Sequence, residues 1–361
     1  MVREISAFPP AVDQHLVRLY EPSDLEPQLR NAGIGVTWLG LRSSWGAYGW
    51  PVGVARLVQE IRRFRPDVIH SSLFAANFVA QTAAILCGRP IVSTFVLSGE
   101  QTLLESYQPR ADTRRARILR KLASLPARNP RVRFRAITQD AAVTNARLLG
   151  VPRDRITVIP RGVVLPDLDA HVPSRAELDL PTEGPIVLNV ARLARQKGQI
   201  HLVRAFERVL KRVPEARLVI VGRPGDAADQ VEEEISRLGL GQAVTLVGYR
   251  PDVGPYLRHA SVFAFPSLME GLGTSVLEAM AAGLPVVAFD IPPVREVTGE
   301  GAVARLVPAG DEAGLADEIC SLLIHGDEGI GGRAREWVEQ RYRLELVASS
   351  LVELLSSTAG R

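Results

Sequence analysis

Short apolar runs alternate along the chain with segments in which apolar residues recur every three or four positions. In the first half, Ile34–Leu39 has the pattern of a buried strand, and Val52–Phe64 has that of an amphipathic helix. Further strands are predicted at 67–70, 90–94, 134–137 and 156–159, and further helices at 75–86, 114–123 and 139–149. This alternation predicts a parallel sheet with helices on both faces.

Residues 162–183 lack periodicity and are rich in proline and acids, which is typical of a linker. The strand–helix rhythm then restarts and continues to two C-terminal helices. Strands are predicted at 186–190, 216–221, 244–247, 262–265, 286–289 and 304–307, and helices at 198–213, 228–238, 253–258 and 274–282. The predicted fold is therefore α/β, with two doubly wound Rossmann-like domains whose ligands bind where loops leave the carboxyl ends of the strands.

The composition is that of a globular protein large enough for two domains. The chain has 361 residues, 46% of them hydrophobic and 23% charged. A membrane span requires a run of about 18 apolar residues, and the sequence has none. Its start lacks the pattern of a secretory signal. Cys87 and Cys320 are far apart in apolar stretches, so we expect free thiols and a cytoplasmic location.

Charge is distributed unevenly between the two halves. Residues 1–165 carry 23 Lys and Arg against 12 Asp and Glu, whereas residues 166–361 carry 20 against 28. The segment 110–135 holds ten basic residues and one acid, Asp112. It is either a solvated basic face or a contact with an anionic membrane surface or a phosphate-bearing acceptor. We expect no nucleic-acid partner.

The segment PSLMEGLGTSVLEAM, residues 266–280, places two carboxylates around the start of a helix that follows a buried strand. The free N–H groups of Gly273, Thr274 and Ser275 suit a phosphate. Glu270 in the loop and Glu278 in the helix can accept hydrogen bonds from pairs of sugar hydroxyls. The alternative is a solvated loop glutamate and a second one favoured by the helix dipole.

Two cations are predicted at the same edge of the second sheet. Arg192 and Lys197 lie in the loop between the first strand and helix of this half, where they would neutralise a leaving diphosphate. A metal site is not expected. No His/Cys cluster has the spacing of a zinc site, and Asp167 and Asp169 lie in the linker rather than at a strand end.

The chain resembles the retaining glycosyltransferases of family 4, which have the GT-B fold. In the second half the resemblance is carried by NVARLARQKGQIHLVRAF, LVIVGRPG, VTLVGYRPDV, FAFPSLMEGLGTSVLEAMAAGLPVVAFD and WVEQRYRLELVASSLVELL. In the first half it is carried by RPDVIHSSLFAANFVAQTAAILCGRPIV and VTNARLLGVPRDRITVIPRGV. Together these motifs cover roughly residues 17–355.

The resemblance implies an acceptor-side domain at 1–165, a donor domain at 166–340 and a final helix at 341–361 that crosses back to the first domain. It implies a nucleotide-diphosphate sugar as substrate, an acceptor hydroxyl on a sugar or glycolipid, and no cofactor. Arg192 and Lys197 would contact the diphosphate, Glu270 the donor sugar and Glu278 the ribose. The amides of Leu272, Gly273, Thr274 and, from its place in the helix, Ser275 would hold phosphate, and Gly222, Tyr249 and Arg250 would flank the base.

The chain departs from the family pattern at two places. Family members open with a strand and a glycine-rich loop, whereas this sequence enters the second strand at about Leu16–Leu19, so we expect one strand–helix unit to be absent. No histidine stands near Phe95 or Val96, and His70 is interpreted as structural. The function predicted is retaining, metal-independent sugar transfer, in the cytoplasm or at the inner face of the membrane. A non-catalytic nucleotide-sugar-binding homologue and a nucleotide-sugar epimerase are the alternatives.

Overall fold

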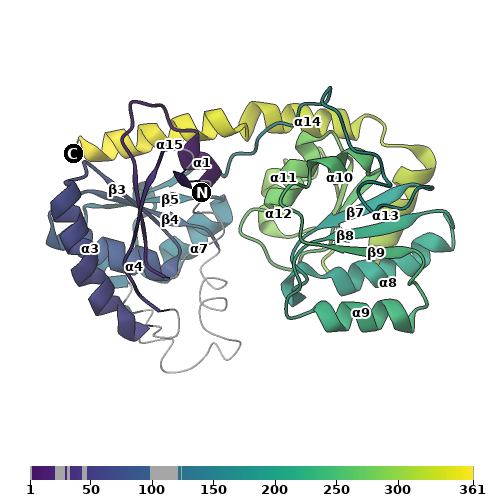
Figure 1. The fold of residues 1–361 in the computed structure, drawn as a ribbon, viewed down its shortest axis with the longest axis horizontal. Coiled ribbons are helices and arrows are strands. Elements are labelled where there is room, and N and C mark those ends of the chain that lie inside the picture. The colour runs from purple at the N-terminus through teal and green to yellow at the C-terminus, as the bar shows by residue number, and fades with distance from the viewer. Residues whose placement is uncertain are drawn as a thin grey trace. The chain divides into compact units, whose positions relative to one another are not determined.

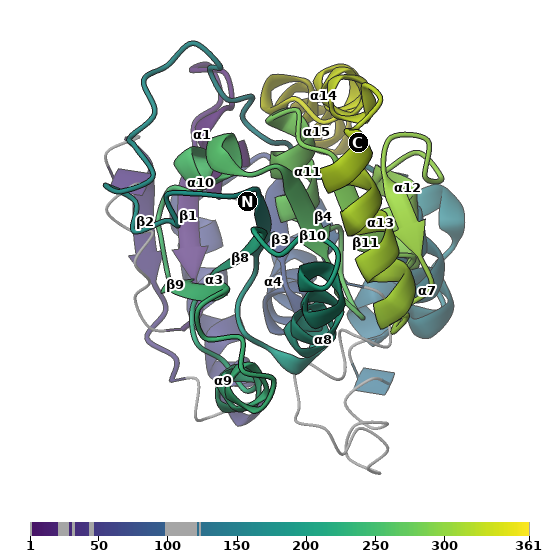
Figure 2. The same cartoon turned by 90° about the vertical axis from the view of Figure 1, so that its right-hand side faces the viewer.

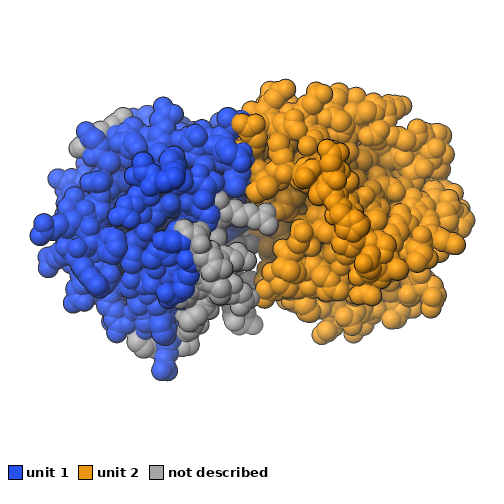
Figure 3. Space-filling model, turned by 45° about the horizontal axis from the view of Figure 1, so that its top comes forward, with its two compact units in different colours: residues 1–162, 344–361 blue, residues 163–343 orange. Residues whose placement is uncertain are grey.

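A computed structural model describes residues 2–20, 29–30, 33–42, 47–97, 121–122 and 124–360. The chain divides into two compact units, one of residues 1–162 with 344–361 and one of residues 163–343 (Figure 3). The predicted bounds, 1–165, 166–340 and 341–361, lie within a few residues of this division.

Unit 1 contains two parallel sheets, which are separate among the described residues. A sheet of two strands pairs β1 with β2, and a sheet of four has the order β3-β4-β5-β6. The strands are β1 (His15–Arg18), β2 (Gly35–Trp38), β3 (Ile69–Ser72), β4 (Ile91–Phe95), β5 (Val132–Ala136) and β6 (Ile156–Val158). The helices are α1 (Val2–Ser6), α3 (Trp50–Phe64), α4 (Phe74–Leu86), α7 (Gln139–Leu149) and α15 (Leu344–Ala359), with a short 3-10 helix, η2 (Arg153–Arg155). No described strand joins β1 to β3.

Helices cover both faces of the four-stranded sheet because successive side chains of β4 point to opposite sides. Ile91 and Phe95 enter a core shared with α3, α4 and α7. Val92 points the other way and packs against Leu351 and Leu355 of α15. The last helix therefore belongs to the core of unit 1, where it lies across the strands (Figure 1).

Unit 2 is built on one continuous parallel sheet of six strands in the order β12-β11-β10-β7-β8-β9. The strands are β7 (Ile186–Val190), β8 (Arg217–Val221), β9 (Val244–Gly248), β10 (Val262–Phe265), β11 (Val286–Phe289) and β12 (Arg305–Val307). The helices are η3 (Arg195–Lys197, 3-10), α8 (Gln199–Leu210), α9 (Ala228–Arg237), α10 (Gly254–His259), α11 (Thr274–Ala281), α12 (Pro292–Val297), α13 (Glu312–His325) and α14 (Ile330–Arg341).

The sheet of unit 2 lies between two layers of helices. Helices α8, α9 and α13 share a large apolar core with alternate residues of the strands, and α8 runs beside α13 (Figure 2). On the other face, α11 contacts β10, β11 and α14. The predicted fold class is confirmed. The prediction of two C-terminal helices was wrong, since α13, α14 and α15 follow β12. Turns at Gly326–Gly329 and Tyr342 break the apolar pattern into three pieces.

Candidate active site

Four loops meet at the carboxyl edge of the sheet in unit 2. Because β10, β7, β8 and β9 are consecutive neighbours, their exit loops are neighbours too. Backbone hydrogen bonds join these loops directly. Leu268 N donates to Gln196 O at 2.8 Å, and Leu193 N donates to Arg223 O at 2.9 Å. The edge is therefore one connected surface, on which all the predicted donor residues lie.

The loop after β10 ends at the N-terminus of α11. Gly273 precedes the helix with a φ of 87°, a left-handed conformation that favours glycine, and as a glycine it offers no side chain to cap the helix. The first-turn amides of Thr274 and Ser275 have no acceptor within the helix. Leu272, which is only 3% exposed, holds the turn against the core. This geometry is compatible with an anion at the helix start, and phosphate binding there stays a prediction.

Lys197 and Glu270, which are 73 residues apart in the sequence, form an ion pair. The distance from Lys197 Nζ to Glu270 Oε1 is 2.6 Å, and the two side chains are 20% and 11% exposed. Arg192 lies in the loop between β7 and η3, where it is exposed and its side chain lies beside Gly225. The sequence predicted that these residues share one edge, but not that lysine and glutamate contact each other.

The second glutamate has a different environment. Glu278 lies one turn into α11 and is partly buried. It belongs to the helix itself, whereas Glu270 belongs to the loop before that helix. The spacing of eight residues therefore places one carboxylate in the loop and the other on the helix.

The residues predicted to flank a base are divided between two loops. A Cβ on Gly222 would stand 1.9 Å from Ala191 O, so only glycine lets these backbones approach. Tyr249 is half exposed, and the guanidinium of Arg223 stacks on its ring at 3.9 Å. Arg250 donates a hydrogen bond from Nε to the Tyr256 hydroxyl at 3.0 Å. The sequence interpretation missed Arg223, although its place directly after Gly222 marks it.

A buried pair of amides supports the loop that carries the cations. Asn189, which is fully buried at the end of β7, donates to Ala264 O at 2.9 Å. Gln199, which is 1% exposed at the start of α8, donates from Nε2 to Arg192 O at 3.0 Å, and the same nitrogen is 3.5 Å from Asn189 Oδ1. Gln199 Oε1 and the hydroxyl of Ser267 are buried without a hydrogen-bond partner among the described residues. The sequence interpretation missed both amides.

In unit 1, His70 bonds to Thr94 through Nε2 and Oγ1 at 2.8 Å. Burial, followed by the nearby positive charge of Arg135, lowers the pKa of His70 to about 4. The imidazole is therefore neutral near pH 7 and takes part in the packing of the sheet.

The basic segment is only partly described. Arg114, Arg117 and Ile118, on the predicted helix at 114–123, lie outside the described residues. Among the described part, Leu122 and Leu125 expose 46% and 64% of their surface beside the exposed Lys121. Apolar and basic side chains thus share this stretch. None of the described helices is both long and apolar enough to cross a bilayer.

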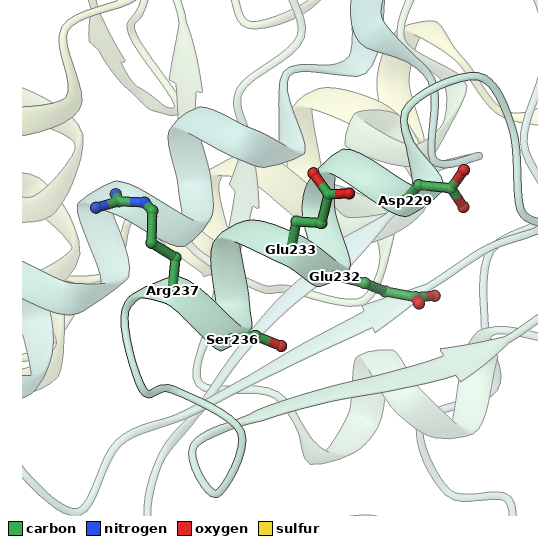
Figure 4. Close-up of a pocket in the computed structure, with 5 residues that line it drawn as sticks. All are labelled: Asp229, Glu232, Glu233, Ser236 and Arg237. Carbon is green, nitrogen blue, oxygen red and sulfur yellow. The ribbon is translucent and has the colours of Figure 1, made fainter.

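A shallow hollow along α9 is lined by Asp229, Glu232, Glu233, Ser236 and Arg237 (Figure 4). Its three carboxylates would repel a diphosphate. Within the described ranges no group of three His, Cys, Asp or Glu side chains could hold a metal ion.

Comparison with known proteins places this edge in context. The profile of the glycosyl transferases group 1 family matches residues 173–341, and that of glycosyltransferase family 4 matches residues 11–165. A 2-deoxystreptamine N-acetyl-D-glucosaminyltransferase from Streptomyces fradiae is 32% identical over 307 residues, which are 80% of this chain and 69% of that enzyme. This chain is a family 4 glycosyltransferase.

Other relatives match over a shorter span. A D-inositol 3-phosphate glycosyltransferase from Nocardia farcinica is 34% identical over 53% of this chain and 45% of its own length. A phosphatidyl-myo-inositol mannosyltransferase from Mycobacterium leprae is 35% identical over 56% of this chain. The matched region of this chain spans about half the length of each of these two relatives.

Solved structures share the fold. HepE from Anabaena, crystallised with UDP and glucose, has a TM-score of 0.82 and 23% identity, and the match covers 99% of this chain and 94% of HepE. A sucrose-phosphate synthase from Thermosynechococcus elongatus has a TM-score of 0.76 and 21% identity over 95% of this chain. The resemblance inferred from the motifs is confirmed, and the family does not favour an epimerase or a non-catalytic binding protein.

Proposed function

We propose that this glycosyltransferase moves a sugar from a nucleotide-diphosphate donor to an acceptor hydroxyl, with retention of configuration and without a metal ion. The observation that carries the proposal is the shared edge of unit 2. There the exposed Arg192, the ion-paired Lys197 and Glu270, and the uncapped start of α11 lie on adjoining loops. Cations with a helix N-terminus suit a diphosphate, and carboxylates suit sugar hydroxyls.

In this proposal the protein acts by position and charge. Arg192, Lys197 and the amides of Thr274 and Ser275 stabilise negative charge on the departing diphosphate. Glu270 orients the donor sugar, and Glu278 binds the ribose. The acceptor hydroxyl attacks the face that the diphosphate leaves, and a phosphate oxygen accepts its proton, so the configuration is retained.

Binding measurements test the donor side. Calorimetry on the full chain with UDP, GDP, ADP and dTDP should detect at least one nucleoside diphosphate. Arg192→Ala and Lys197→Ala should each weaken that binding by about tenfold or more, since a hydrogen bond to a charged group is worth about 1.5–3 kcal/mol. Lys211→Ala is the matched control, because Lys211 pairs with Glu207 on the surface of α8. If both site variants lose less than twofold, the assignment is wrong.

We further propose that the acceptor is a hydroxyl of a cell-envelope glycan or glycolipid, reached by a cytoplasmic enzyme that attaches to the inner face of the membrane. The exposed Leu122 and Leu125 beside Lys121 support this, together with the basic excess of residues 1–165. Each surface cation adds about 1 kcal/mol on an anionic bilayer.

Liposome co-sedimentation tests the membrane attachment. The protein should pellet with anionic but not neutral lipid, and added salt should release it. Leu125→Gln should weaken the attachment, whereas Leu86→Gln should not, because Leu86 is an equally exposed leucine at the end of α4. Equal recovery in the supernatant with both lipids would favour a soluble phosphorylated acceptor or a merely solvated face.

A further inference from the structure

The side chains of Lys197 and Glu270 are paired with each other. Lys197 Nζ is 2.6 Å from Glu270 Oε1, and both side chains are mostly shielded from water. The loops that carry them are fixed to each other. A Cβ on Gly198 would stand 2.1 Å from Pro266 O, and Leu268 N donates to Gln196 O. Glu270 is thus held against the cation that would meet a diphosphate.

Ligands of two kinds would affect this pair differently. A diphosphate that binds Lys197 brings negative charge close to the Glu270 carboxylate, and like charges repel at short range. A donor sugar offers hydroxyl groups, which donate hydrogen bonds to the carboxylate and replace its lost contact with Lys197. The bare diphosphate has no such group to offer.

We infer that Glu270 is a specificity-determining residue that favours the intact donor over the nucleoside diphosphate product. This rests on the proposed function and goes beyond it. Glu270 orients the sugar and also weakens the hold of the site on the diphosphate once the sugar has left. The carboxylate therefore promotes product release as well as donor positioning.

Glu270→Gln tests the inference because glutamine keeps the size and removes the charge. Affinity for inorganic pyrophosphate and for UDP, GDP, ADP and dTDP is measured by calorimetry on the full chain. The diphosphate that binds the wild type should bind the variant at least about fivefold more tightly, given the repulsion between charges at this distance. Inhibition of turnover by that product should strengthen by a similar factor, while turnover itself falls.

Glu339→Gln is the control for the change in net charge, since Glu339 pairs with Arg335 on the surface of α14. It should leave diphosphate affinity unchanged. Equal or weaker binding by Glu270→Gln, or an equal gain in both variants, overturns the inference. If the wild type binds none of the five probes, the proposed donor site itself is wrong, and the inference fails with it.

Discussion

The buried amide of Gln199 gives a prediction in which stability and function separate. Gln199 Nε2 donates to Arg192 O at 3.0 Å, and its Oε1 is buried without a partner among the described residues. We consider Gln199→Met, which keeps the length of the side chain and removes both polar atoms. The hydrogen bond that is lost contributes about 0.5–1.5 kcal/mol. Removal of an unpaired buried oxygen raises the free energy of unfolding by about 1–3 kcal/mol.

Because these two effects oppose each other, the free energy of unfolding should lie between about 0.5 kcal/mol below and about 2.5 kcal/mol above that of the wild type. Donor binding should still weaken. The loop that carries Arg192 loses a hydrogen bond that contributes about 0.5–1.5 kcal/mol. The free energy needed to order this loop must then come from ligand binding, which lowers the affinity about two- to tenfold. Gln199 acts here as a positioning residue, through Arg192.

Denaturant unfolding and calorimetric titration with a nucleoside diphosphate measure the two effects. Gln81→Met is the matched control, because Gln81 is a buried glutamine of α4 whose Nε2 donates to Ser93 Oγ in unit 1. It should lower stability and leave diphosphate affinity unchanged. In an Arg192→Ala background, Gln199→Met should weaken binding no further. Additive losses in the double variant would refute the positioning role.

Three further predictions follow from particular residues. Burial lowers the pKa of His70 to about 4, whereas an unfolded histidine titrates near 6.5, so stability should fall by up to about 1.4 kcal/mol per pH unit as pH drops from 6.5 to 4. Unfolding curves across that range should show the slope, and His70→Gln should flatten it. Gly222→Ala should cost about 2 kcal/mol or more and reduce diphosphate binding, because its Cβ would stand 1.9 Å from Ala191 O. Gly241→Ala, whose Cβ would meet open space, should do neither in the same unfolding and titration assays. Turnover should survive EDTA, and an activity that only Mn²⁺ or Mg²⁺ restores would contradict metal independence.

Much of unit 2 was predictable because local pattern and topology agree there. Parallel strands are fully buried and read as apolar runs, as in Val262–Phe265 and Val286–Phe289. The topology of such a sheet then brings the loops after successive strands to one edge. The placement of Arg192, Lys197 and Glu270 on that edge needed no more than these two rules.

The buried amides were not predictable in the same way. Gln199 opens an amphipathic helix, and a polar residue there reads as part of the solvated face. Its burial follows from the approach of β7 and the loop after β10, which the periodicity of α8 does not encode. Asn189 likewise interrupts an apolar strand without showing that its amide bonds across to Ala264. Such groups emerge only when three distant segments are brought together.

The two glutamates of the segment 266–280 show what spacing can and cannot specify. Eight residues place Glu270 before α11 and Glu278 within it, so the sequence predicts two carboxylates near one anion site. The pairing of Glu270 with Lys197 depends on the loop after β7, 73 residues away. That contact holds Glu270 against a cation, and we predict that a bound diphosphate would place a like charge beside it. The motif alone does not distinguish the two glutamates, whereas the fold places Glu270 against Lys197 and Glu278 within helix α11.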